Sequence, residues 1–239
     1  FETNVSVDVN YTDAVSGART IQMMGLEGTY TQIQMENIPY LRGLEQPFGL
    51  ASFPGTWINS IQITKGTGTV INGYESMAGL VNIEMFKPEK MDELFVNFYS
   101  NAYTRNEFNI HGSMHIGPKW NTALFGHVSG ALAAMDMNKD GFMDLPIGGL
   151  ASFNNRWSYE GKKMEAQVGV NAYYENKFGG QTNFRPWIKD SSRYGLHSVS
   201  KHVDVYAKPG FSLRQPRTSL GVVYNLNYHA IFANYGTRT

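Results

Sequence analysis

The chain has 239 residues, which is enough to bury a core in one large domain or in two modest ones. Lys and Arg together number 20, as do Asp and Glu, so the formal net charge is zero and we expect no nucleic-acid partner. There is no cysteine, which excludes disulfides, thiolate nucleophiles and cysteine metal sites. The 25 glycines and the high share of Tyr and Phe favour a mostly β chain.

The first part of the chain consists of short apolar runs broken by Gly and Pro. These runs, which read as short strands, are "VSVDVNY", "TIQMMGL", "TYTQIQM", "SIQIT" and "GLVNIEMF". A loop-rich segment, residues 39–57, separates the third run from the fourth. The pattern predicts a small mixed α/β domain over residues 1–88.

After residue 88 the runs lengthen and alternate between apolar and polar residues. Val168 and Val170 share one parity with Ala166 and Ala172, and Leu220 and Leu226 show the same period. The predicted strands cover 92–103, 107–117, 119–134, 150–160, 163–176, 198–212 and 217–231. We therefore expect about seven strands over residues 89–239. The segments around "LFVNFYSNAY" and "TALFGHVSGALAA" alternate less cleanly.

Two architectures fit such strands. In a soluble sandwich the apolar face points into a core. In a transmembrane barrel it points to lipid, strands run to about ten residues, and aromatic residues gather at the strand ends. The predicted strands are long and their ends are rich in Tyr, Trp and Phe, which favours an antiparallel transmembrane β-barrel and outer-membrane lipid as a partner.

The lengths of the connections support the barrel. The links "GPK", "EGK" and "RQPR" are short, whereas the links at about 135–149 and 177–197 are long. Outer-membrane barrels have short turns on the periplasmic side and long loops outside. We expect the two long links to face the cell exterior.

The stretch "WINSIQITKGTGTVINGYESMAGLVNIEMFKP" resembles the end of the plug domain of TonB-dependent outer-membrane receptors. In that family a strand ending in Lys-Gly or Arg-Gly is followed by a small-residue turn, a strand introduced by glycine, and the barrel. The matching residues are Ile58, Ile61, Ile63, Lys65, Gly66, Gly73, Gly79, Val81, Asn82 and Ile83. Upstream, "ENIP" at residues 36–39 stands where many members carry Asp-Gly, a hydrophobic residue and Pro.

The resemblance implies an outer-membrane receptor of a Gram-negative bacterium that imports a scarce solute. A siderophore, metal chelate or vitamin would bind on the outer face, and a TonB-type energy-coupling protein in the periplasm would rearrange the plug. The family's barrel has 22 strands, so we expect this chain to be part of a longer receptor. Two alternatives stay open: a subunit of a larger outer-membrane assembly without transport of its own, and a secreted, calcium-stabilised β-sandwich binding protein.

Two groups of residues are candidates for roles within such a receptor. For the plug surface that faces the solute or the barrel wall we select Tyr40, Arg42, Phe48 and Phe53, because aromatic rings and an arginine suit both chelate binding and packing. For contacts between the plug and the barrel wall we select Lys65 and Glu75, since a polar wall suits charged partners; the alternative is that both are solvated turn residues.

The stretch "DMNKDGFMD" follows the spacing of a calcium-binding loop. Asp136, Asn138 and Asp140 supply oxygens at alternate positions, followed by the carbonyl of Phe142 and the side chain of Asp144. An EF-hand would have Glu at the position of Ile147, so we predict a structural Ca²⁺ site in an extracellular loop. The alternative is a solvated turn.

The other candidate signals favour packing. His111 and His115 lie four residues apart on one predicted strand, about 13 Å from end to end. With His127 they are expected to face the barrel interior or an interface. Neither a catalytic triad, a P-loop nor a metalloprotease motif occurs, so we expect no enzyme.

Overall fold

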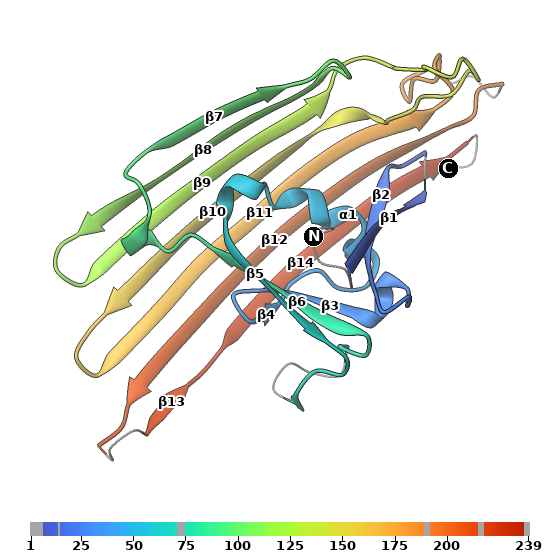
Figure 1. Ribbon diagram of the computed structural model, residues 1–239. Helices are drawn as coiled ribbons and strands as arrows, with labels where there is room; N and C mark the ends of the chain where they lie inside the picture. Colours follow the sequence, from blue (N-terminus) through green and yellow to red (C-terminus); the bar gives the residue numbers. More distant parts are fainter. Residues whose placement is uncertain (1–6, 14, 71–74, 189–191, 215–217, 237–239) are drawn as a thin grey trace.

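The structure is a computed structural model that describes residues 7–13, 15–70, 75–188, 192–214 and 218–236, and it is mostly β (Figure 1). Residues up to Pro88 form a compact part, which we call the inner domain. The following strands form one long curved sheet, which we call the wall. None of the described helices is long and apolar enough to cross a membrane.

The inner domain contains a two-stranded and a four-stranded sheet. β1 pairs antiparallel with β2; in the larger sheet the order is β4-β3-β6-β5, with β3 and β6 parallel and the other pairs antiparallel. The strands are β1 (Val7–Asp13), β2 (Ala18–Met23), β3 (Thr31–Met35), β4 (Ile38–Pro39), β5 (Ile58–Lys65) and β6 (Gly79–Met85). The short helices are η1 (Gly28–Tyr30), η2 (Gly43–Glu45), α1 (Gln46–Gly49), η3 (Leu50–Ser52), η4 (Gly55–Trp57) and η6 (Pro88–Lys90).

The wall is an antiparallel sheet in which each strand pairs with the next along the chain, from β7 to β12, while both β13 and β14 pair with β12. Its strands are β7 (Phe95–Ser100), β8 (Arg105–Ile116), β9 (Trp120–Ala131), β10 (Ile147–Glu160), β11 (Met164–Gly180), β12 (Gly195–Ser212), β13 (Ser219–Gly221) and β14 (Tyr224–Tyr235). The predicted strands therefore all occur, with the last one divided between β13 and β14.

The wall is polar on its inner side and apolar on its outer side. On β12 the side chains of Ser200, His202 and Asp204 are buried, whereas Val203 and Val205 between them are more than 40% exposed. The sandwich alternative is wrong, because the apolar parity points away from the protein: Val168 is 41% exposed and Leu226 is 75% exposed. This polarity is that of a transmembrane barrel.

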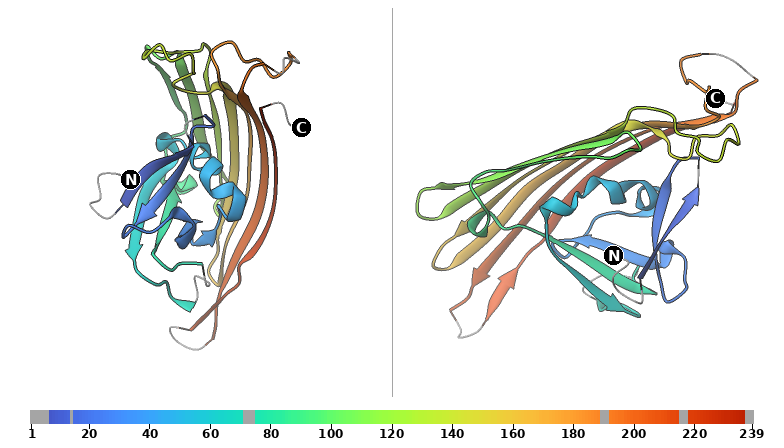
Figure 2. Two further views of the ribbon diagram at one scale, coloured as in Figure 1. Left: turned by 90° about the vertical axis from the view of Figure 1, so that its right-hand side faces the viewer. Right: turned by 45° about the horizontal axis from the view of Figure 1, so that its top comes forward.

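The inner domain lies against the concave face of the wall, as the turned views show (Figure 2). One apolar cluster joins the two parts: Ile33, Ile83 and Trp57 of the inner domain pack in the same cluster as Phe125 and Tyr206 of the wall. The rings of Trp57 and Phe125 have centroids 5.5 Å apart. Gly169 is needed for this packing, because a Cβ there would lie 2.5 Å from the Tyr206 ring.

Candidate functional site

A buried ion pair joins the inner domain to the wall. Arg156 Nη1 of β10 lies 3.0 Å from Glu36 Oε1, and each side chain is at most 5% exposed. The same guanidinium nitrogen donates to the Phe86 carbonyl at 3.3 Å. Glu36 Oε1 also accepts the Met85 amide at 3.0 Å. The carboxylate therefore has several donors, as a buried charge requires.

The backbone around Glu36 explains how its side chain reaches the wall. Glu36 and Asn37 join β3 to β4 with φ of 55° and 63°, the left-handed region used in tight hairpin turns. Asn82 Oδ1 accepts the Asn37 amide at 2.8 Å, and Lys208 Nζ of β12 donates to the Glu36 carbonyl at 2.9 Å. The sequence departs from the family's Asp-Gly pattern at this turn, and the departing residue forms the ion pair.

A second buried contact joins η2 to the wall. Tyr173 of β11 donates its hydroxyl hydrogen to Glu45 Oε1 at 3.0 Å, and His202 Nδ1 of β12 lies 2.6 Å from the same oxygen. The Tyr173 and His202 rings stack with centroids 5.2 Å apart. Each of the three side chains is buried. Glu45 therefore anchors the helical segment of the inner domain to two neighbouring strands.

Tyr40 completes this cluster from the inner domain. Its ring lies 4.9 Å from that of His202 and 4.8 Å from that of Phe53. Burial raises the pKa of Tyr40 well above its ordinary value, and the negative charge of Glu45 raises that pKa further. The phenol therefore stays neutral and serves packing.

An open cleft of about 720 Å³, which we call the inner cleft, lies between the inner domain and the wall at the end where the long links are. Its sides include the β1–β2 hairpin, the segment 50–55, the inward side chains of β7 to β11, and Pro146. Its charged and aromatic lining residues are Tyr11, Arg19, Phe53, Tyr99, Arg105, Glu107, His127, Glu175 and Lys177.

Four charged side chains of the inner cleft form two ion pairs, so both signs are present. Arg105 Nε lies 2.5 Å from Glu107 Oε1, and Lys177 Nζ lies 3.0 Å from Glu175 Oε2. The Arg19 guanidinium lies over the Tyr11 ring, 4.4 Å from its centroid, and donates a hydrogen bond to the hydroxyl of the same tyrosine. This mixture of rings and polar groups suits a polar organic solute.

The structure separates the four residues predicted for the solute-facing surface. Tyr40 is buried against His202, whereas Phe53 is half-buried and lines the inner cleft. Arg42 is exposed and makes a bidentate contact with Glu75, with Arg42 Nη2 2.5 Å from Glu75 Oε1. The side chain of Phe48 lies outside the described residues. Solute binding by these residues stays a prediction.

Lys65 and Glu75 are not placed against the described strands of the wall. Glu75 pairs with Arg42 inside the inner domain, and Lys65 is exposed at the end of β5. Gly73, which belongs to the motif of the resemblance, lies outside the described residues. The predicted contact of Lys65 and Glu75 with a barrel wall stays a prediction.

The acidic loop is held by hydrogen bonds within itself. Asp136 accepts the amides of Asp140 and Gly141 at 3.2 and 3.0 Å, and Asp144 accepts the Met137 amide at 2.9 Å. Asp140 accepts the Phe142 amide at 2.8 Å, and Asn138 accepts the Asp140 amide at 3.2 Å. In the described part of the chain no three His, Asp or Glu side chains form a group that could hold a metal. The side chains would have to converge to bind Ca²⁺.

The sequence reasoning missed Glu36, Glu45, Arg156 and His202. One signal was available: Arg156 has the inward parity of Asn154 and Ser158, and an arginine on the polar side of a wall strand requires a partner. The partner, 120 positions earlier in the chain, could not be predicted from residue spacing.

The three histidines considered in the sequence differ in their surroundings. His111 and His127 are buried next to inner-domain rings, whereas His115 is exposed.

Comparison with solved structures places this architecture among known ones. The siderophore receptor PiuA from Acinetobacter baumannii has a TM-score of 0.66 at 11% identity, covering 96% of this chain and 33% of that chain. The FrpB iron transporter from Neisseria meningitidis has a TM-score of 0.65 at 9% identity, covering 95% and 37%. The copper transporter OprC has a TM-score of 0.61 at 12% identity, covering 95% and 42%.

The chain has the plugged-barrel fold of the TonB-dependent receptors. The inner domain corresponds to their plug and the wall to part of their barrel, so the resemblance read from the sequence is confirmed at the level of the fold. The chain spans between a third and a half of the length of these three structures. No protein-family model matches it, and neither does any curated protein.

Proposed function

We propose that the chain is the plug and the first barrel strands of a TonB-dependent outer-membrane receptor that imports a scarce solute. The names of the similar structures mention a siderophore, iron and copper, which supports a metal or metal chelate over a vitamin. The wall would cross the outer membrane with its apolar face in lipid, and the long links would face the exterior.

The observation that carries this proposal is the buried pair Glu36–Arg156. A solute could pass along the concave face of the wall only after the inner domain moves, and moving it separates two charges that are shielded from water. The pair and its hydrogen bonds must break before water can reach either charge, so they oppose the movement. The Glu45 contacts with Tyr173 and His202 add to this barrier. Work from an energy-coupling protein in the periplasm would supply the difference.

The inner cleft is the proposed solute site. It lies at the long-link end of the wall and combines the rings of Tyr11 and Phe53 with the cation of Arg19. Rings and cations can hold a chelate through stacking and through its anionic groups. A solute there would contact Phe53, whose ring packs on Tyr40 next to His202.

We also propose that the loop around Asp136 and Asp140 binds Ca²⁺ weakly on the exterior. Three carboxylates and an amide within nine residues support this, since hard cations prefer such oxygens. The hydrogen bonds that now engage Asp136 and Asp144 would compete with the ion, so the site would be structural and weak.

The test uses the full-length receptor in a strain from which its own gene has been deleted. Uptake of labelled ferric siderophores, copper chelates and a vitamin is measured before and after a protonophore collapses the proton gradient. We expect one class to be imported only by the complemented, energised cells. The double variant Tyr11→Ala/Phe53→Ala should raise the half-saturating concentration at unchanged surface level, whereas Tyr224→Ala, on the outer side, should not.

The result that contradicts transport is a receptor that reaches the surface but imports none of these classes. Co-purification with other outer-membrane subunits would then identify the chain as an assembly component.

A further inference from the structure

A second hollow, which we call the outer pocket, opens on the face of the wall that points away from the inner domain. It has a volume of about 640 Å³ and lies at the long-link end. Gly149 and Ala151 of β10 form its floor, and Val128 of β9 and Tyr174 of β11 line it on the two neighbouring strands. Gly148, Gly149 and Leu150 also line the inner cleft, whereas Val128, Ala151 and Tyr174 line only the outer pocket of the two.

The hollow exists because small residues interrupt an outer face of large ones. Ala151 pairs with Val128 on one side and with Tyr174 on the other, so a small side chain stands between two larger ones. Further along β10 the outward residues are Phe153 and Trp157, which are 44% and 36% exposed. The small side chain of Ala151 therefore leaves an indentation near the long-link end of the wall.

The link after β11 covers this indentation. The chain leaves the wall there toward the side away from the inner domain (Figure 2). Pro186 and Trp187 line the pocket from this link, and the Trp187 ring lies 5.6 Å from that of Phe178.

The described part of the link nearest the pocket, residues 181–188, is held by backbone hydrogen bonds. The Gln181 amide donates to the Tyr194 carbonyl at 3.0 Å, and the Thr182 amide donates to the Gly141 carbonyl at 2.9 Å. The Ile188 amide donates to the Arg185 carbonyl at 3.0 Å.

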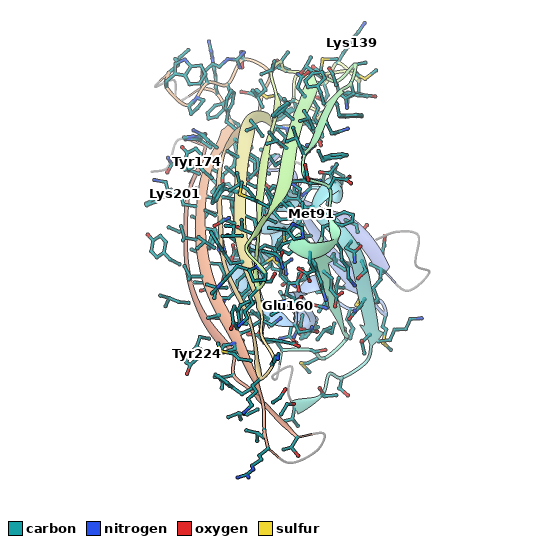
Figure 3. All side chains as sticks on the ribbon, turned by 90° about the vertical axis from the view of Figure 1, so that its left-hand side faces the viewer. Met91, Lys139, Glu160, Tyr174, Lys201 and Tyr224 are labelled. Carbon is teal, nitrogen blue, oxygen red and sulfur yellow. The ribbon has the colours of Figure 1, made fainter. Side chains whose placement is uncertain are left out.

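The chemistry of the pocket is apolar inside and cationic at its edge. Its lining contains no acidic residue among the described residues. Lys201 of β12 pairs with Tyr174 in the sheet, and its Nζ lies 5.8 Å from the Tyr174 ring centroid. Figure 3 shows both side chains pointing away from the inner domain. The Arg185 guanidinium lies 5.9 Å from the Phe178 ring centroid.

We propose that the outer pocket holds one acyl chain of an anionic outer-leaflet lipid, with the lipid's phosphate near Lys201 and Arg185. The pocket is continuous with the apolar outer face of the wall, and its volume is in the range of small-ligand pockets, roughly 300–1,000 Å³. A lysine on that face is stable where the headgroups begin, since its ammonium can meet a phosphate there. This inference rests on the proposed placement of the wall in the outer membrane.

The experiment uses the full-length receptor in vesicles that contain phosphatidylglycerol with a photoreactive diazirine on one acyl chain. After illumination, labelled peptides are located by mass spectrometry. We expect the label to concentrate on residues 148–151, 174–178 and 186–187. Ala151→Phe fills the floor and should lower that labelling several-fold. Ala166→Phe is the matched control, because Ala166 has the outward parity of β11 near the short-turn end.

The charge at the edge is tested by comparing phosphatidylglycerol with phosphatidylcholine that carries the same acyl chain. The anionic lipid should label the pocket more strongly in competition, and Lys201→Gln should reduce this preference. Equal labelling by the two lipids overturns the phosphate contact.

Two results overturn the acyl-chain site and have different meanings. Label spread evenly over the outer face and unaffected by Ala151→Phe means that lipid only surrounds the wall, so the site is wrong while the membrane placement stands. No label anywhere on the outer face means that the wall does not meet lipid, and then the proposed function fails as well.

Discussion

Arg156 of the wall and Glu36 of the inner domain form an ion pair 3.0 Å long between side chains that are nearly inaccessible to water. We predict that Arg156→Met destabilises the docked inner domain by about 3–5 kcal/mol, because it leaves the Glu36 carboxylate buried without its cation. Hydrogen exchange of the amides in β3 and β6 should be faster in the variant, at an unchanged content of β structure.

Two further variants distinguish the ion pair from general packing. Glu36→Gln combined with Arg156→Met should cost less than the sum of the single changes, since the uncompensated charge is gone. Arg105→Met removes the half-exposed pair with Glu107 and should cost only about 0–1 kcal/mol. Strict additivity in the double variant would contradict the pairing.

The contact between Tyr173 and Glu45 gives a second prediction. Tyr173→Phe keeps the ring that stacks on His202 but removes the hydroxyl that donates to Glu45. We expect a loss of about 1.5–3 kcal/mol in unfolding free energy, the usual value for a hydrogen bond to a charged group. Thermal unfolding of the purified receptor measures this.

Tyr159→Phe is the matched control for that change. Tyr159 lies near the short-turn end of β10 and packs against the Trp120 ring, with centroids 4.9 Å apart. Its hydroxyl makes no hydrogen bond to the described residues of the inner domain, so the change should be nearly neutral. Equal losses in the two variants would contradict a specific role of the Tyr173 hydroxyl.

The residues of the wall that point away from the inner domain give a third prediction. Val205→Arg puts a charge on the lipid side near the middle of β12, where such a charge lowers the stability of a barrel by about 2–4 kcal/mol. Leu220→Arg in β13 lies close to the short turn, so it should lower the stability by only about 0–1 kcal/mol. Folding into lipid vesicles, followed by urea titration, compares the two. A larger cost at Leu220 would contradict the placement of the strands across the membrane.

The alternation of apolar and polar residues made the strands of the wall predictable. The strand that departs from this alternation, β9, has a physical reason to do so. The segment of β9 that did not alternate in polarity does alternate in burial, from Asn121 through His127. Polarity fails as a signal there because Phe125 is an inward residue that packs on Trp57 of the inner domain. A barrel wall that touches a plug thus carries apolar residues on both faces.

The contacts of the candidate site were less predictable, because they join distant parts of the chain. Glu36 adopts a left-handed conformation that is uncommon for glutamate, and no local rule predicts it. Glu45 lies in a segment, residues 39–57, that reads as loop and folds into one α-helical turn between 3₁₀ turns. Spacing rules identify neighbours along one element, whereas these residues meet partners on β10, β11 and β12.

The acidic loop gives the last prediction, in which two changes at Asp136 separate ion binding from loop structure. Asp136→Asn removes the charge but keeps one of the two oxygens that accept the Asp140 and Gly141 amides, so Ca²⁺ affinity should fall roughly tenfold while the loop keeps part of its hydrogen bonding. Asp136→Ala removes both the charge and the accepting oxygens.

Calorimetric titration with Ca²⁺ should give a Kd of about 10⁻⁴–10⁻³ M for the unaltered receptor, as in weak extracellular sites. Asp8→Asn in the β1 strand serves as the control, since it removes an equal charge far from this stretch of sequence. Equal affinities for the unaltered receptor and Asp136→Asn, or no heat of binding at millimolar Ca²⁺, would mean that the aspartates only shape a turn.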